Sequence, residues 1–185
     1  MKWNKLYKYP KTVRSKVDGE RIYEVDDEKL PSVTTILGAT QSDEKRESLA
    51  KWIAKKGKTE ADRVKNEAAK RGTAMHSILE RHILGNNVLD LTDVGQEAHR
   101  MAKVVIEKGF PNLEEVWGSE VTLRYPGLYA GQTDLVGVFD YENSIVDFKQ
   151  SNRPKRKEWI DDYFMQLGAY AMAHNCVYDT DITQG

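Results

Sequence analysis

Two carboxylates and a lysine on neighbouring predicted strands are the residues of this 185-residue chain whose types and spacing most clearly suit chemistry. Asp134 lies on one predicted strand, and Asp147 and Lys149 lie on the next. Side chains two residues apart on a strand point to the same face, so Asp147 and Lys149 project together. The intervening Phe148 and the preceding Val146 project the opposite way, into a core. Such a grouping suits metal-assisted attack on a phosphodiester bond.

The loop between these two strands decides whether Asp134 joins the other two groups. An even-length loop, such as 140–143, pairs Phe139 with Ser144. That register sets Asp134 opposite Lys149 and brings all three charged groups to one face. A loop of odd length would turn Asp134 to the other face unless a bulge repaired the register. The sequence leaves both possibilities open.

The elements that must hold these residues follow from hydrophobic periodicity and from turn and cap residues. The expected helices span 31–38, 43–56, 60–84 (with a possible bend at 71–73), 93–108 and 157–175. The expected strands form a hairpin over 12–25 and a meander over 115–125, 129–139 and 144–150, and a further strand begins at 180–183. Helices, then an antiparallel β-meander, then a helix predict a mixed α/β fold with helices flanking the meander.

We expect one domain over 1–185. It comprises an N-terminal arm and hairpin at 1–30, a helical part at 31–110 and a core at 111–185 that carries the chemistry. The N-terminal half is therefore expected to be largely helical. Because the chain stops where a strand would return to the sheet, we expect the core to be truncated at its C-terminal end.

Composition narrows the class of protein. The chain is 39% hydrophobic and 31% charged, which is an ordinary globular profile. Cys176 is the only cysteine, so intramolecular disulfides and all-cysteine metal sites are excluded. The sequence has no apolar run of membrane-spanning length and no secretory signal, so we expect an intracellular protein without a membrane partner. The net charge of −1 argues weakly against a nucleic-acid partner, but the basic residues are clustered.

Four separated segments carry a resemblance to a known family. They are PSVTTIL at 31–37, RGTAMH at 71–76, the strand pair 131–137 with 145–149, and QLGAY at 166–170. Together they resemble the PD-(D/E)XK nuclease superfamily, and more narrowly its RecB-type branch of phage exonucleases and mitochondrial genome maintenance exonucleases. Their order and spacing are more specific than any one motif. Gln132 and Thr133 stand where the family name has a proline, which the RecB-type branch commonly lacks.

The resemblance implies a restriction-endonuclease-like core with a metal site. Asp134 and Asp147 would bind Mg²⁺, for which Mn²⁺ can substitute, since both ions prefer oxygen ligands. It also implies His76 as a metal ligand. Glu120 matches an acidic ligand of many relatives, but it is equally consistent with an exposed strand residue. Lys149 would stay protonated, orient the attacking water and stabilise charge on the phosphate.

A helix face and a set of cations complete the expected site. Gln166 and Tyr170 are four residues apart and share a helix face, which could simply be buried against the sheet. By resemblance, Gln166 would hold Lys149 or a metal-bound water, and Tyr170 would touch a phosphate. The cations expected to contact a nucleic-acid backbone are Arg71, Arg153, Lys155, Arg156 and Lys157.

These observations lead us to expect a Mg²⁺-dependent deoxyribonuclease. The resemblance implies an exonuclease that prefers single-stranded DNA or free ends and serves DNA replication, recombination or repair, in the cytoplasm, a mitochondrion or a phage-infected host cell. Two alternatives stay open. One is a structure-specific or restriction-type endonuclease. The other is a non-catalytic nucleic-acid-binding module on the same fold, against which the retention of Asp134, Asp147 and Lys149 argues.

Overall fold

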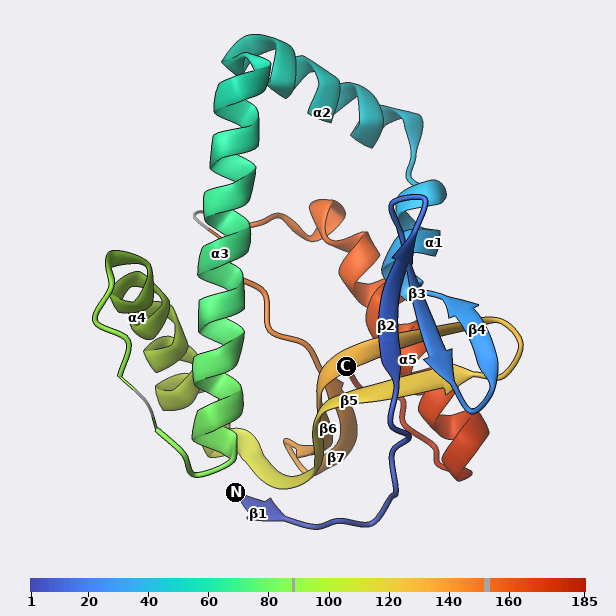
Figure 1. Cartoon of the computed structure of the whole chain (residues 1–185). Helices are drawn as coiled ribbons and strands as arrows, with labels where there is room; N and C mark the ends of the chain where they lie inside the picture. Colours follow the sequence, from blue (N-terminus) through green and yellow to red (C-terminus); the bar gives the residue numbers. More distant parts are fainter. Residues whose placement is uncertain (88, 152–153) are drawn as a thin grey trace. The chain divides into compact units, whose positions relative to one another are not determined.

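The fold is mixed α/β, which confirms the fold class expected from the order of elements. The computed structural model describes residues 1–87, 89–151 and 154–185 (Figure 1). The chain divides into two compact units. The first unit contains Met1–Gly38 and Glu107–Gly185, and the second contains Ala39–Ile106. The positions of the two units relative to one another are not determined.

A four-stranded sheet organises the first unit, in the order β1-β5-β6-β7. Its strands are β1 (Lys2–Trp3), β5 (Leu113–Tyr125), β6 (Tyr129–Phe139) and β7 (Glu142–Val146). The strands β5, β6 and β7 form an antiparallel meander, in agreement with the predicted order, and β1 runs parallel to β5. The strand β1 was not predicted, because a two-residue strand carries no periodicity.

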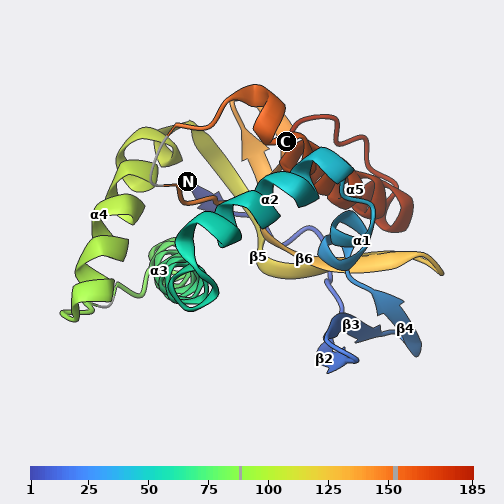
Figure 2. The ribbon, with the colours of Figure 1, turned by 90° about the horizontal axis from the view of Figure 1, so that it is seen from above.

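The helix α5 (Asp161–Tyr178) packs against this sheet and places Tyr170 in the core of the first unit (Figure 2). The buried residues of that core are Val33, Trp117, Leu123, Val136, Ile145, Tyr170, Ala173 and Ile182. The prediction of one helix over 157–175 is wrong at both ends. A short 3₁₀ helix, η2 (Lys157–Trp159), precedes α5, and Asp179 ends α5 with a left-handed backbone at φ 52°. A second 3₁₀ helix, η1 (Phe110–Asn112), leads into β5.

The N-terminal part of the first unit is a three-stranded antiparallel sheet, not mainly helix. Its strands are β2 (Val13–Val17), β3 (Glu20–Val25) and β4 (Glu28–Pro31). The predicted hairpin over 12–25 is confirmed, and β4 is an addition. The helix α1 (Val33–Ala39) follows, and the Ser32 hydroxyl caps it by accepting a bond from the Thr35 N–H at 3.0 Å.

The second unit is helical, with α2 (Asp43–Lys56), α3 (Lys58–Ile83) and α4 (Asp93–Lys108), whose last two residues belong to the first unit. The predicted bounds hold within two residues because the local stop signals are strong. Gly57 separates α2 from α3 with φ 82°, and Gly85 follows α3 with φ 74°. The helix α3 continues through 71–73, where a bend was considered. Among the described residues, no helix combines the length and apolar character needed to cross a membrane.

The strand predicted over 144–150 is shorter than expected. The strand β7 ends at Val146, so Asp147 and Lys149 follow it rather than lie on it. The turn before it has two residues, Asp140 and Tyr141, both with left-handed backbones at φ 49° and 67°, as a type I′ hairpin requires. The four-residue loop considered for this hairpin is therefore wrong.

The shorter turn changes the register by two residues. Leu135 pairs with Val146, so continuing the ladder sets Asp134 opposite Asp147 rather than opposite Lys149. Because side chains alternate with a period of two, a two-residue shift keeps the predicted faces. The strand expected at 180–183 is replaced by one isolated parallel bridge between Gln184 and Ser144.

Candidate active site

Asp134 lies near the middle of β6, and the residue is only 7% exposed. Its Oδ2 accepts a hydrogen bond from the backbone N–H of Phe148, with an N···O distance of 2.5 Å. Phe148 is itself buried, and its ring packs against Phe110 at a centroid distance of 6.0 Å. The segment that follows β7 is therefore fixed at two points, one polar and one apolar, beside the Asp134 carboxylate.

The Asp147 carboxylate receives donors from two directions. Lys149 Nζ donates to Oδ2, and Gln166 Nε2 donates to Oδ1 at 3.2 Å. The Asp147 side chain is 8% exposed, whereas that of Lys149 is 35% exposed and reaches solvent. Each carboxylate oxygen has two lone pairs, so one such bond does not by itself use the full acceptor capacity of an oxygen. The arrangement holds a nearly buried negative charge beside an accessible ammonium.

Gln166 and Tyr170 come from α5, and both side chains are buried. The Gln166 amide donates to the Tyr170 hydroxyl at 3.1 Å, so one amide links the phenol to Asp147. Burial raises the pKa of the Tyr170 phenol, and the nearby charges of Asp147 and Asp134 raise it further, while the bond from Gln166 opposes them. Tyr170 therefore stays a neutral hydroxyl beside the two carboxylates. The sequence predicted that Gln166 and Tyr170 share a helix face. In the structure both side chains on this face are buried, and both end in polar groups.

The ring of Tyr170 requires glycine on the facing strand. A Cβ atom placed on Gly131 of β6 would lie 2.5 Å from a ring carbon and 2.9 Å from the hydroxyl of Tyr170. Real Cβ atoms do not approach other heavy atoms so closely. Gly131 therefore lets α5 bring Tyr170 and Gln166 close to the sheet.

Glu120 on β5 lies across from Asp134. The neighbouring pairs Ser119–Leu135 and Val121–Thr133 bracket this position, and one carboxylate oxygen of Glu120 lies within 4.8 Å of one of Asp134. Glu120 has a left-handed backbone with φ 53°, which is unfavourable for a residue with a side chain.

The amide of Gln132 stabilises this unusual backbone. Gln132 Nε2 donates to Glu120 Oε2 at 2.6 Å and to the Glu120 carbonyl at 3.3 Å. Glu120 thus has a strained backbone, and its carboxylate is held in place by Gln132. Both features favour the metal-ligand interpretation over that of a plain exposed strand residue. Sequence reasoning missed Gln132. Its position two residues before Asp134, on the same strand face, is the signal that could have found it.

The donor set of the first unit fits a hard divalent cation. Glu120 and Asp134 offer carboxylate oxygens within reach of a single ion, and such oxygens suit Mg²⁺ or Mn²⁺. Asp147 directly follows Val146, the last residue of β7 that pairs with β6, and Asp134 directly precedes its partner Leu135. His76 lies half-buried on α3 in the second unit, so its place among the ligands stays a prediction.

The ring of Tyr163 on α5 contacts two lysines. Its ring centroid lies 5.3 Å from Lys149 Nζ and 4.7 Å from Lys155 Nζ, and Lys155 also donates to the Tyr163 hydroxyl. Both distances are within the range of a cation–π contact. The contact of Tyr163 with two lysines was not predicted from the sequence.

The other predicted cations are distributed over both units. Arg156 stacks over Trp159 at 5.4 Å, and Lys157 begins η2 as an exposed residue. Arg153 lies outside the described residues. In the second unit, Arg71 pairs with Glu97 on α4 at 3.4 Å, and its side chain is only 13% exposed. Part of the Arg71 charge is therefore balanced within its own unit.

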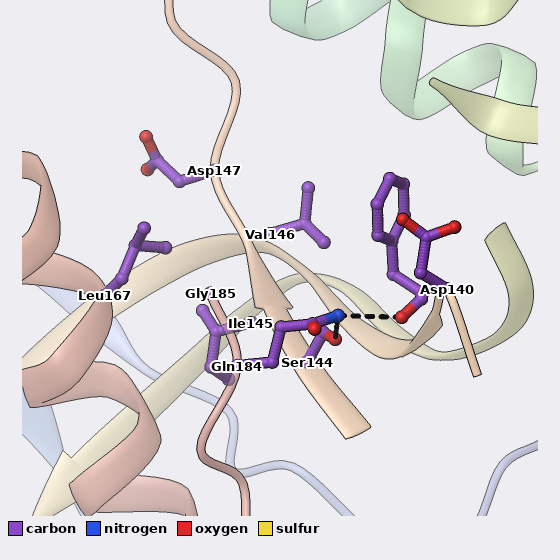
Figure 3. A pocket seen from close by; sticks show the side chains of 9 residues that line it. Asp140, Ser144, Ile145, Val146, Asp147, Leu167, Gln184 and Gly185 are labelled. Carbon is purple, nitrogen blue, oxygen red and sulfur yellow. Dashed lines mark hydrogen bonds between the residues drawn. The ribbon is translucent and has the colours of Figure 1, made fainter. Parts of the chain in front are cut away.

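A pocket borders Asp147 on the outer side of β7 (Figure 3). The side chain of Gln184 closes part of it by donating to the Phe139 carbonyl at 2.7 Å and to Ser144 Oγ at 2.8 Å. The lining includes Leu167 and Gly185 but neither Asp134 nor Gln166. This hollow adjoins the cluster of polar groups rather than containing it.

Comparison with protein-family models gave no match for this chain, and comparison with curated proteins gave none either. The case for a function therefore rests on the residues and geometry of the site.

Proposed function

We propose that this chain is a metal-dependent deoxyribonuclease of the PD-(D/E)XK type. In this proposal it is an exonuclease that hydrolyses phosphodiester bonds in single-stranded DNA or at free DNA ends, inside the cell, during replication, recombination or repair. One observation carries the proposal. The Asp147–Lys149 pair follows β7 and is held beside Asp134 by the Phe148 N–H bond, with Gln166 donating to Asp147.

The carboxylates are the proposed ligands of a divalent cation. Asp134 and Asp147 would hold Mg²⁺, and Glu120 and the backbone carbonyl of Phe148 are further proposed oxygen ligands. His76 is the proposed nitrogen ligand from the second unit. When bound, such an ion neutralises phosphate charge and lowers the pKa of a coordinated water.

The other residues of the site act on the substrate by donating hydrogen bonds. Lys149 pairs with the nearly buried carboxylate of Asp147 but is itself partly exposed to solvent. Its ammonium can therefore donate to a phosphate oxygen and to the attacking water. The water oxygen forms the new bond to phosphorus as the bond to the leaving oxygen breaks, and the proton that the water loses passes through solvent to the leaving oxygen. Lys149 donates hydrogen bonds in this scheme and transfers no proton. Gln166 orients Asp147, and the neutral hydroxyl of Tyr170 is a donor for a phosphate oxygen.

The test compares end-labelled linear and circular single-stranded DNA in Mg²⁺, with EDTA and with Asp134→Asn as controls. The proposal predicts that linear DNA is degraded, that circular DNA stays intact, and that both controls abolish cleavage. Cleavage of the circle would identify an endonuclease instead. DNA binding without cleavage in either Mg²⁺ or Mn²⁺ would identify a non-catalytic binding module and reject the nuclease.

A further inference from the structure

The charged residues of β2 and β3 segregate between the two faces of the small sheet. Directly opposed residues of antiparallel strands share a face, and here Arg14 is opposite Tyr23 and Lys16 is opposite Arg21. The other face carries the acidic residues of β3, because Glu24 is opposite Val13 and Glu20 is opposite Val17. We call the surface formed by Arg14, Lys16 and Arg21 the cationic face.

The cationic face belongs to the side of the small sheet that packs on β6. Tyr23 and Leu30, which follow Arg14 across the sheet, form a buried cluster with Ala130 of β6. The phenol of Tyr23 also lies near enough to that of Tyr170 to interact with it electrostatically. The cationic face therefore starts beside a residue of the candidate active site.

The Arg21 end of the small sheet lies at the point where that sheet joins β6. Ser32, just after β4, forms a parallel bridge with Ala130, and its N–H donates to the Arg21 carbonyl at 3.0 Å. Ser32 therefore links Arg21 to Ala130, which lies four residues before Asp134 on β6. All these residues belong to the first unit, so their arrangement is internal to it.

The three cations have no acidic partner within the described part of the chain. Among the residues that the structure describes, Arg14, Lys16 and Arg21 form no ion pair, although Lys29 on the other face pairs with Glu24 at 3.2 Å. Arg14 and Lys16 are exposed, and Arg21 is half-buried. Like charges directly opposed across two strands, such as Lys16 and Arg21, destabilise a sheet. An anionic ligand would relieve that repulsion.

We propose that the cationic face binds backbone phosphates of the nucleic-acid strand that enters the candidate active site. This inference rests on the proposed nuclease function and extends it to a second contact surface, separate from the cations at 153–157. The occupant is a single nucleic-acid strand, because the face adjoins Tyr23, which lies near Tyr170 of the candidate active site. Glu28, the acid that shares the face by register, pairs with Arg124 at 2.8 Å and not with the three cations. An acidic peptide or an anionic membrane would not need that proximity.

The experiment measures binding without cleavage. Arg14→Gln, Lys16→Gln and Arg21→Gln are combined in an Asp134→Asn chain, and the anisotropy of a fluorescein-labelled oligothymidylate is followed across a KCl series. Each lost phosphate contact on a single strand lowers the salt slope of log Kobs by about 0.7, so the triple change should reduce it by about 2. Affinity at physiological salt should fall at least about tenfold.

The matched control is Lys29→Gln on the opposite face of the same sheet, which should leave the slope unchanged. If the triple variant unfolds, as thermal denaturation would show, the exposed pair Arg14→Gln and Lys16→Gln should still lower the slope by about 1.4. An unchanged slope, an equal loss in Lys29→Gln, or tight binding to anionic vesicles without binding to the oligothymidylate would overturn the inference. Failure of the unmodified chain to cleave DNA would reject the nuclease, while the slope measurement would still decide the cationic face.

Discussion

The carboxylate of Asp134 accepts a hydrogen bond from the backbone N–H of Phe148 at 2.5 Å. This bond joins β6 to the segment that follows β7, beyond the last ladder pair between Leu135 and Val146. Asp147 and Lys149 flank Phe148, so the bond fixes both of them near Asp134 although neither lies on a strand. Asp134 thus has two tasks in our proposal, since its Oδ2 organises the backbone and its carboxylate is also a proposed ligand of the cation.

These two tasks can be separated by substitution. Asp134→Asn keeps an oxygen that can accept the Phe148 N–H but loses the charge, so Mn²⁺ affinity should fall at least about tenfold with little loss of stability. Asp134→Ala leaves the buried N–H without its acceptor and should also cost about 1–3 kcal/mol in the free energy of unfolding. Mn²⁺ titration by electron paramagnetic resonance and urea unfolding measure the two effects. Equal free energies of unfolding for the two variants would show that the bond from the Phe148 N–H does not contribute to stability.

Lys149→Ala should abolish the chemistry while sparing binding. The ammonium is proposed to act on charge that develops in the transition state, so single-turnover cleavage should slow by at least about a hundredfold. Oligonucleotide affinity and Mn²⁺ affinity should change less than about threefold. Cleavage at a rate near that of the unmodified chain would refute the role of Lys149.

Tyr163 is a positioning residue for Lys149 in the same scheme. Tyr163→Leu removes the ring beside both lysines, and a cation–π contact at an exposed site contributes about 0.5–1 kcal/mol, so kcat should fall about twofold to fivefold. Tyr163→Phe keeps the ring and loses only the hydroxyl that Lys155 contacts, so kcat should be retained. A larger loss in Tyr163→Phe than in Tyr163→Leu would assign the effect to the hydroxyl instead.

Gly131→Ala should push Tyr170 away from the sheet. The new Cβ would lie 2.5 Å from the Tyr170 ring, and overpacking of this kind typically costs about 1–3 kcal/mol. Cleavage should fall as well, because Gln166 bonds both Tyr170 and Asp147. The double variant with Tyr170→Leu tests the cause. If the two destabilisations simply add, the clash with Tyr170 is not their source.

His174 should make the protein less stable at acidic pH. The residue is fully buried among Tyr7, Tyr9, Trp117 and Tyr178, and burial lowers its pKa to about 4 from the ordinary 6.5. Between pH 4 and 6.5 the imidazole of His174 therefore binds a proton more readily in the unfolded chain than in the folded one. The free energy of unfolding falls as the pH falls from about 6.5 to 4, by about 3 kcal/mol in total. Urea unfolding at several pH values measures this slope. In His174→Gln it should flatten, and an unchanged slope would assign the titration to other groups.

The secondary structure was predictable wherever local chemistry specifies it. The hairpin over 12–25 turns at Asp18 and Gly19, with φ 51° and 87°, and the helix bounds at Ser42 and Gly57 coincide with a cap and a left-handed glycine. These signals act over three or four residues, so they can be read from the chain. The start of α5 was missed because Ile160 provides no side-chain cap.

The types of the candidate site residues and the α/β order came from the sequence, whereas their arrangement depended on the tertiary structure. The end of β7 at Val146 and the two-residue turn at 140–141 result from competing non-local contacts, namely the ladder with β6 and the bond from Phe148 to Asp134. Likewise, Gln132 holds Glu120 across two strands. Sequence periodicity fixes which face a side chain occupies, because alternation is local. Only packing decides which partner lies across from it, because that choice is made between residues distant in the chain.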